Sequence, residues 1–359
     1  MRLFYKHIYK TLMGPLILGI VGSTFIFLVD TLSEIVQSVI IRGIPLLKVL
    51  EILSYDIIHL LVLSIPMGVM IGAILGYDSL SKSNELVAFK SLGISERSVI
   101  LPPFIVGIFF SSLLFTVNQF LSPIAKVRRD SLLQEIAYNK PVFRFEDNTF
   151  MTGLKNYSIY VKEGKEKGSW KFLVFQNHSY KFSDVMLGEG LKGVKGALVL
   201  ENAINYEIDD QGKRRASSTF EKQSIPLREV VSNFGTLDGW PEEYLLSFTD
   251  LYRRIQFLKR EGYSTLRLRN MFHWKIALTF SPIILALLSA LLASDSHRRF
   301  GKGDNIALGI ALLFFYWLWM IIGRGIANDE LLKPYIVMWT PNVLYALLAF
   351  HLYLRRARA

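Results

Sequence analysis

Residues 65–95 read IPMGVMIGAILGYDSLSKSNELVAFKSLGIS, and the character of the chain changes in the middle of this stretch. The first half is apolar and continues a run that begins near residue 49, so that together they can cross a hydrocarbon core of about 30 Å. From residue 79 to residue 95 the sequence is too polar for the bilayer, and another apolar run begins near residue 101. We therefore expect a membrane-spanning helix, a short helix in water, and then a second membrane-spanning helix.

Apolar stretches recur along the whole chain, in which 51% of the residues are hydrophobic. The first stretch is longer than the core of a signal peptide and no clean cleavage site follows it, so we interpret it as an uncleaved helix. The second contains Asp56 and His59 and is interrupted by Pro66; one tilted, kinked helix is expected, with two shorter buried helices as the alternative. The six predicted spans lie near residues 11–29, 49–76, 101–121, 274–293, 306–326 and 335–354.

The distribution of basic residues predicts the orientation of these spans. Lys and Arg gather at both termini and in the segments 79–100 and 294–305, which all lie on one side of the membrane if there are six spans. Because positive charge is retained in the cytoplasm, we expect both termini to be cytoplasmic. The same distribution accounts for the net charge of +11 without a nucleic-acid partner. The chain has no cysteine, which excludes disulfides and thiol chemistry and fits an exported domain in a bacterial periplasm.

Residues 122–273 separate the third span from the fourth and have a different pattern. Apolar and polar residues alternate in NYSIYVKEG (156–164) and INYEIDD (204–210), and WKFLVFQN (170–177) is rich in aromatics. Such runs are typical of strands, and turn residues at 163–168 and 209–213 separate them. Helical patterns flank the strands at 124–139 and 242–262. We expect an all-β domain, a sandwich or an open barrel, on the non-cytoplasmic side and inserted between spans three and four.

The predicted organisation is therefore spans one to three in 1–121, the β domain in 122–273 and spans four to six in 274–359. Motifs for catalysis are missing from all three parts. GEGLKG at 188–193 and FGKGDN at 300–305 lack the Gly-Lys-Ser/Thr ending that a phosphate-binding loop requires. The six histidines are scattered, and no serine has the spacing of a nucleophile elbow. We expect a protein that is not an enzyme and that binds no cofactor or metal of its own.

The polar segment 79–95 has the signals of a short helix. Ser81, Ser83 or Asn84 can cap its start, and Gly93 suits its end. Within it, Glu85 lies in the first turn, where the helix dipole favours an acid. Two interpretations stay open: an amphipathic helix that lies on the lipid headgroups, or a docking helix on a cytoplasmic partner. In the second, an apolar knob and one acid would enter a groove of the partner. The residues in question are Glu85, Leu86, Phe89, Lys90, Leu92 and Gly93.

The chain resembles the LptF/LptG family of lipopolysaccharide-export permeases over nearly its full length. The similarity includes RGIPLLKVLEIL (42–53), the stretch 65–95 quoted above, and NKPVFRFEDNTFMTGLKNYSIYVKEG (139–164). It continues in LYRRIQFLKREG (251–262), in FHWKIALTFSPIILALLSALLA (272–293) with Lys275 and Pro282, and in MWTPNVLYALLAFHLYL (338–354). Residues 79–95 are the most specific part of it.

The resemblance implies six transmembrane helices and a periplasmic β-jellyroll in the inner membrane of a Gram-negative bacterium. It also implies a heterodimer of two such permeases on a cytoplasmic ATPase dimer, where ATP and Mg²⁺ would bind. Lipopolysaccharide would enter sideways from the membrane and pass through the jellyrolls to a bitopic periplasmic LptC-like protein. Glu85 takes the place of the family's coupling-helix glutamate, which faces the ATPase.

The resemblance further implies that spans one and five form lateral gates. Span five is unusually aromatic, and its side chains either contact acyl chains of the substrate or face ordinary lipid. Family members often carry basic residues near the outer end of span one, where this chain has Asp30 and Glu34 instead. The phosphates would then be bound by Arg42 and Arg324, by a bridging divalent cation or by the partner permease. The candidate gate residues are Phe25, Asp30, Glu34, Arg42, Phe315, Tyr316, Trp319 and Arg324.

Other functions fit the sequence less well. A permease for lipoproteins or peptides would usually have four spans, which the six apolar stretches disfavour. A membrane scaffold that transports nothing would need no docking helix for an ATPase. A secondary transporter would have polar residues at mid-membrane and paired broken helices, of which Asp56 and His59 are the only trace.

Overall fold

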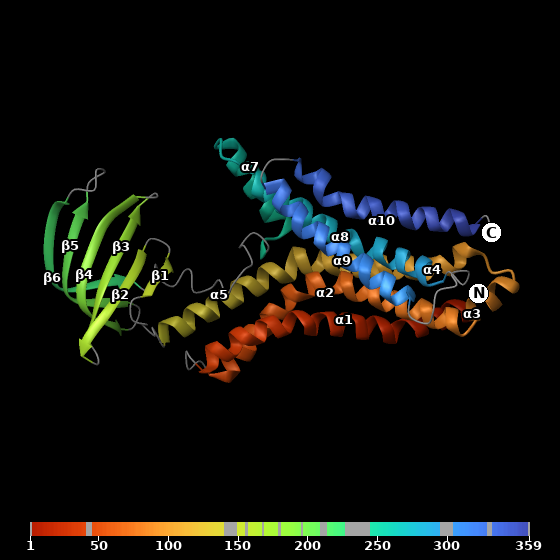
Figure 1. The fold of residues 1–359 in the computed structure, drawn as a ribbon, viewed down its shortest axis with the longest axis horizontal. Coiled ribbons are helices and arrows are strands. Elements are labelled where there is room, and N and C mark those ends of the chain that lie inside the picture. Colours follow the sequence, from red (N-terminus) through yellow and green to blue (C-terminus); the bar gives the residue numbers. More distant parts are fainter. Residues whose placement is uncertain are drawn as a thin grey trace. The chain divides into compact units, whose positions relative to one another are not determined.

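The computed structural model describes residues 2–40, 45–139, 149–154, 157–166, 169–178, 181–194, 197–208, 214–226, 245–294, 304–328 and 332–357. The chain divides into two compact units (Figure 1). The first comprises Met1–Thr31, Asp56–Ala125 and Pro241–Ala359, and the second comprises Leu32–Tyr55 and Lys126–Trp240. The first is helical, and the second contains a β-sheet together with parts of three helices.

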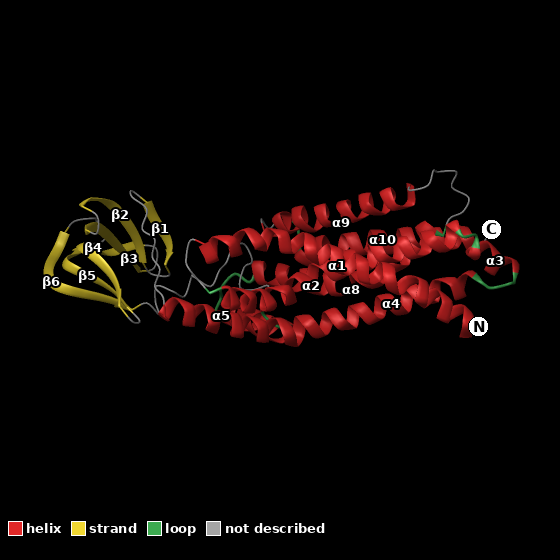
Figure 2. Ribbon diagram, turned by 90° about the horizontal axis from the view of Figure 1, so that it is seen from below, coloured by secondary structure: helices red, strands yellow, loops and turns green. Residues whose placement is uncertain are grey.

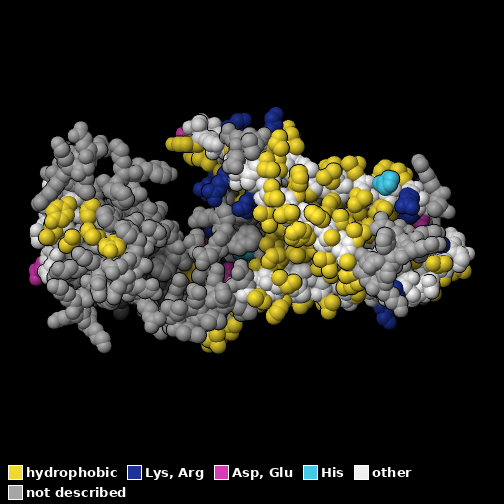
Figure 3. All heavy atoms as spheres, in the orientation of Figure 1, with side chains coloured by type: hydrophobic (Ala, Val, Ile, Leu, Met, Phe, Trp, Pro, Cys, Tyr) yellow, Lys and Arg dark blue, Asp and Glu magenta, His cyan; other side chains and the backbone are white. Residues whose placement is uncertain are grey.

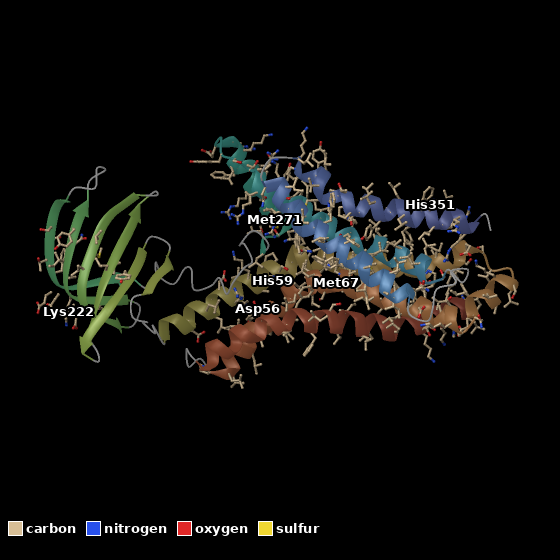
Figure 4. All side chains as sticks on the ribbon, viewed as in Figure 1. Asp56, His59, Met67, Lys222, Met271 and His351 are labelled. Carbon is tan, nitrogen blue, oxygen red and sulfur yellow. The ribbon has the colours of Figure 1, made fainter. Side chains whose placement is uncertain are left out.

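Among the residues that the structure describes, six helical segments are long and apolar enough to cross a membrane, as the sequence predicts. The second is one continuous helix that contains Pro66, so the interpretation as a single helix is confirmed. Asp56 and His59 lie one turn apart in it (Figure 4). The helices are α1 (Arg2–Ile40), α2 (Leu46–Lys82), α3 (Glu85–Ser91), α4 (Glu96–Thr116), α5 (Ser122–Asn139), α7 (Phe248–Arg260), α8 (Leu266–Ala293), α9 (Asp304–Asn328) and α10 (Pro334–Ala357), with a π-helical turn η1 (Val117–Leu121) between α4 and α5.

Helices α2 and α8 form the centre of the helical unit. Their apolar windows are 67% and 72% buried, against 22% for α1 and 28% for α9. Helix α8 packs on α4, α9 and α10. Helix α1 packs on α2 through small residues, since Gly68, Gly72 and Gly76 repeat at every fourth position and face α1. Such a stripe lets two helix backbones approach closely. Close packing is a main source of helix association in membranes, because lipid tails are as apolar as the side chains and the hydrophobic effect does not drive the helices together.

The helical unit has polar ends and an apolar middle. Both termini and α3 lie at one end of it, in Figure 1 and in the perpendicular view of Figure 2. On the face that Figure 3 draws, hydrophobic side chains cover the middle, and Lys and Arg side chains gather toward the ends. This is the surface of a multi-pass membrane protein, because apolar side chains face lipid and charged ones reach water.

The described strands form one antiparallel sheet in which each strand pairs with the next in the chain. Val174 of β3 lies opposite Met186 of β4, and both are buried. The three predicted strands are confirmed within β2, β3 and β5, whereas β1, β4 and β6 were not predicted. A jellyroll, sandwich or barrel remains a prediction. The strands are β1 (Thr149–Leu154), β2 (Tyr157–Glu166), β3 (Ser169–His178), β4 (Lys181–Val194), β5 (Ala197–Ile208) and β6 (Arg214–Pro226).

The flanking helices are confirmed as α5 and α7. Helix α7 begins at Phe248, later than its pattern suggests, because Ser247 forms its N-cap and accepts a hydrogen bond from the backbone of Asp250. The predicted turn at 209–213 lies outside the described residues.

Candidate docking and gating sites

Helix α3 is short because the residues at its two ends stop the helical backbone. Its last helical residue is Ser91, and Gly93 follows the C-cap residue Leu92 with a φ of 78°, which glycine adopts at no steric cost. There the amide of Gly93 donates to the Lys90 carbonyl at 2.9 Å and the amide of Ile94 donates to the Phe89 carbonyl at 3.0 Å, which is a Schellman motif. At the start, Asn84 occupies the N-cap position without a side-chain hydrogen bond to the helix. The predicted stop at Gly93 is therefore confirmed.

Helix α3 is held on the first turns of α1. Leu86 is 5% exposed and lies in the apolar cluster that also contains Phe4 and Ile8 of α1. Phe89 packs edge-on against Phe4, with ring centroids 4.8 Å apart. Glu85 Oε2 lies 2.5 Å from His7 Nε2, which adds a polar contact to the apolar ones. The inner face of α3 thus packs on α1 of the same chain.

The carboxylate of Glu85 has two partners in the chain. The hydrogen bond with His7 is the largest cause of a lowered Glu85 pKa; partial burial opposes it, and a hydrogen bond from Ser83 adds to it. Ser83 Oγ donates to Glu85 Oε1 at 2.8 Å. Lys90 forms an ion pair with Glu96 at the start of α4. Glu85 is therefore held as an anion and is still 36% exposed, so that one more donor has access to it.

The outer surface of α3 is apolar at two positions. Val87 is 50% exposed and Leu92 is 76% exposed. The structure thus brings an accessible acid and two exposed apolar side chains together at one short helix. Sequence reasoning included Leu92 and missed Val87, although the helical period, which places Val87 about 100° around from Leu86, could have indicated it. Leu86 itself anchors the helix and is not part of its accessible surface.

The aromatic residues of α9 divide into exposed and buried sets. Phe315 is 60% exposed and Trp319 is 42% exposed. Phe25, on α1, is also 60% exposed. Tyr316 is 1% exposed, and its hydroxyl donates to Asn342 Oδ1 at 3.1 Å. Asn342 of α10 in turn donates to the Ala277 carbonyl of α8 at 2.8 Å. Tyr316 therefore belongs to a polar link between three helices, and Asn342 is a residue that sequence reasoning missed, although an amide inside an apolar helix signals it.

The charged gate candidates are placed only in part. Asp30 and Glu34 belong to α1, but their side chains lie outside the described part of the chain, and so does all of Arg42. Arg324 lies near the end of α9 and is half-buried, and its backbone carbonyl accepts a hydrogen bond from Asn270 at 3.0 Å. Of these four residues the structure thus describes only the side chain of Arg324, and a common site stays a prediction.

Lys275 is a further buried cation in the helical unit. Its side chain is fully buried in α8, and Nζ donates to the Leu246 carbonyl at 2.6 Å. The ammonium also lies 5.5 Å from the centroid of the Phe248 ring. These contacts join the segment before α7 to α8, and they give the lysine that the resemblance includes a structural role at this position.

Comparison with known proteins finds similarity over most of the chain. A profile of the family described as "Lipopolysaccharide export system permease LptF/LptG" matches residues 6–355. The "Lipopolysaccharide export system permease protein LptF" of Escherichia coli K12 is 21% identical over 350 residues, which are 93% of this chain and 91% of that protein. An uncharacterized protein of Rickettsia prowazekii is 21% identical over 238 residues, and the alignment spans 65% of each protein.

Proposed function

Because the chain belongs to the LptF/LptG family of lipopolysaccharide export system permeases, we propose that it is one of two permease subunits of an ATP-driven lipopolysaccharide exporter. In this proposal residues 1–121 and 274–359 form the membrane part, and residues 122–273 form a periplasmic jellyroll. The chain lies in the bacterial inner membrane with both termini in the cytoplasm. It binds no cofactor of its own, since ATP and Mg²⁺ bind to a separate ATPase dimer.

The observation that carries the proposal is the attachment of α3 to α1. A docking helix transmits force only if it is bound firmly to the element that must move, because packed elements shift as units. Helix α3 has this property through the contacts of Leu86, Phe89 and Glu85 with the first turns of α1. Val87 and Leu92 remain exposed for the ATPase. Motion of the ATPase would then reach span one directly.

Helices α1 and α9 are suited to the gates that the proposal assigns to them. They are the two least buried of the six candidate spans in the described part of the chain. A helix can separate from its neighbours only if few contacts have to break. An acyl chain that passes between the helices needs apolar surface along its path. Phe25 on α1 and Phe315 on α9 supply exposed aromatic surface of this kind. Arg42 and Arg324, a divalent cation or the second permease would bind the phosphates.

The β-sheet suits transfer of a lipid through water. Exposing an acyl chain costs about 0.8 kcal/mol per CH₂ group, so a carrier must cover the chain with apolar surface. Val174 and Met186 contribute such side chains to the sheet. Strand β6 is an edge of the described sheet, and an edge strand can extend into the sheet of the next protein in line. We propose a bitopic periplasmic LptC-like protein as that neighbour.

Affinity purification tests the proposal. The full chain is isolated from its native membrane in mild detergent, and bound proteins are identified by mass spectrometry. We expect a P-loop ATPase and a second six-span permease. Val87→Asp and Leu92→Asp, which place a charge on the exposed surface of α3, should lose the ATPase and keep the permease. Ser91→Ala, an exposed change in the same helix, is the matched control. Recovery of the chain without an ATPase would refute the proposal.

A further inference from the structure

A hollow lies on the surface of the helical unit between α4, α8 and α10. It has a volume of about 420 Å³ and is lined by two-turn stretches of three helices, within residues 97–104 of α4, 284–291 of α8 and 346–353 of α10. Seven residues of helix extend about 10 Å, so the hollow is a groove of that length along the helix axes. Ala346 and Ala349 line it together with the larger side chains of Phe104 and Phe350.

The groove is apolar except at its mouth. Of the lining residues only Arg97 and Tyr353 carry polar side-chain groups, and they come together there, since Arg97 Nε donates to the Tyr353 hydroxyl at 3.3 Å. Tyr353 lies half a turn beyond His351, which Figure 4 labels near the C-terminal end of α10. The mouth therefore opens toward the end of the helical unit where the termini lie.

The charge at the mouth has no acid to neutralise it among the described residues. Arg97 is exposed, and no described carboxylate forms an ion pair with it. Arg356 lies beside the groove as well, but its guanidinium donates to the Leu291 carbonyl and to the Ser294 hydroxyl, so Arg97 alone is the candidate for the headgroup. Basic pockets between membrane helices on this side bind anionic lipid headgroups. A guanidinium can bind a phosphate with two parallel hydrogen bonds. Because Arg97 uses Nε for its hydrogen bond to Tyr353, its two terminal nitrogens can donate to a phosphate.

We propose that this groove binds one acyl chain of an anionic phospholipid and that Arg97 binds the phosphate of the same molecule. The bilayer is as apolar as the groove, so burial of the chain gives little affinity over bulk lipid. Selectivity must therefore come from the headgroup. The site is separate from the proposed gates on α1 and α9 and does not depend on the transport of lipopolysaccharide.

Native mass spectrometry of the full chain in detergent tests this inference. Dioleoyl phosphatidylglycerol and dioleoyl phosphatidylcholine are titrated separately, and the apparent Kd of the first bound lipid is compared. We expect the wild type to bind the anionic lipid about tenfold more tightly, which is the effect of one charge-assisted hydrogen-bonded pair. Arg97→Gln should bring the two Kd values close together, and Arg97→Lys, which keeps the charge and loses the paired hydrogen bonds, should keep only part of the preference.

Two matched controls make the test specific. Arg355→Gln removes an exposed charge at the same end that does not line the groove, and it should keep the preference. Ala346→Trp fills the groove and should weaken both lipids, whereas Leu347→Trp, exposed and outside the groove, should weaken neither. If Ala346→Trp does not elute as a single species, the Arg97 variants decide. An unchanged preference in Arg97→Gln, or equal losses in Arg97→Gln and Arg355→Gln, would overturn the inference and leave the groove to another occupant such as a partner's helix.

Discussion

At the scale of single residues, Glu85 is the side chain whose role depends most on its surroundings. Its position on α3 suggests an acid presented to an ATPase, yet His7 of the same chain already binds it. A partner's cation would have to share Glu85 with His7 or replace His7. Glu85 therefore holds α3 on α1, and in the proposed function it has a second, separable role as a contact of the ATPase.

A pair of variants distinguishes these functions. Glu85→Ala removes both contacts, whereas His7→Ala removes only the internal one and leaves the carboxylate for the partner. If the ATPase binds Glu85, His7→Ala should retain the ATPase in the affinity purification and Glu85→Ala should lose most of it. Equal loss in the two variants would instead assign Glu85 to positioning α3 alone.

The pH dependence of stability tests the bonding of Glu85. Because its pKa in the folded chain lies below the ordinary value of 4.5, the carboxylate stabilises the fold above that pH. The contribution is lost as the pH falls through the lowered pKa. We expect Glu85→Ala to lower Tm slightly at pH 7 and to have no effect once the pH is well below 4.5. Ser91→Ala is the control, and a difference that grows on acidification would contradict the assignment.

At the scale of elements, the contact between α1 and α2 depends on glycine. A Cβ atom at Gly72 would lie 2.5 Å from the Cα atom of Leu16, and one at Gly68 would lie 2.4 Å from the Cα atom of Ile20. These contacts are with backbone, which cannot move aside as a side chain can. The stripe therefore sets how closely α1 approaches α2, and with it the position of α3, which α1 carries.

The stripe yields a prediction on stability. Gly72→Ala should lower the free energy of unfolding by about 1–3 kcal/mol, because the added methyl forces the two helices apart. Gly22→Ala, in α1 and with open space around its Cβ position, should be neutral or stabilising by up to about 1 kcal/mol. Thermal unfolding in detergent measures both. Similar Tm values for the two variants would show that α1 and α2 are not in close contact.

At the scale of the whole molecule, the proposed orientation places α3 in the cytoplasm and the link between α7 and α8 in the periplasm. The even number of candidate spans agrees with both termini lying at the same end as α3. The proposed orientation also places the mouth of the groove, at Arg97, in the cytoplasmic leaflet. Both the docking of an ATPase and the binding of an anionic phospholipid would thus take place on the same side of the membrane.

Labelling of single cysteines tests this orientation, and the natural chain is a cysteine-free background for it. Ser264→Cys and Ser91→Cys are both at exposed positions. A membrane-impermeant maleimide added to intact spheroplasts should label Ser264→Cys and should label Ser91→Cys only after the membrane is permeabilised. The reverse pattern would invert the topology, and labelling of both without permeabilisation would refute the six-span arrangement.

Much of the fold could be predicted because it depends on local properties of the chain. The lengths of the apolar stretches predicted six spans, alternation predicted two strands, and an aromatic-rich run predicted a third. Strand β6 was missed because its polar sequence has no alternation, and its pairing with β5 defines it instead. In the candidate site, the period of α3 places Glu85 and Phe89 one turn apart, and both contact α1. It did not indicate that Leu86 faces inward, because that depends on where α1 lies.

The sequence by itself determined the membrane class of this protein, its six candidate spans and the short helix that stops before Gly93. Apolar length and a glycine at positive φ act within a few residues, so they can be read without the fold. Only the tertiary structure decided that Glu85 binds His7, 78 residues away, and that Arg97 meets Tyr353, 256 residues away, at the mouth of a groove. Those contacts arise from helix packing, which brings together residues that no local pattern connects.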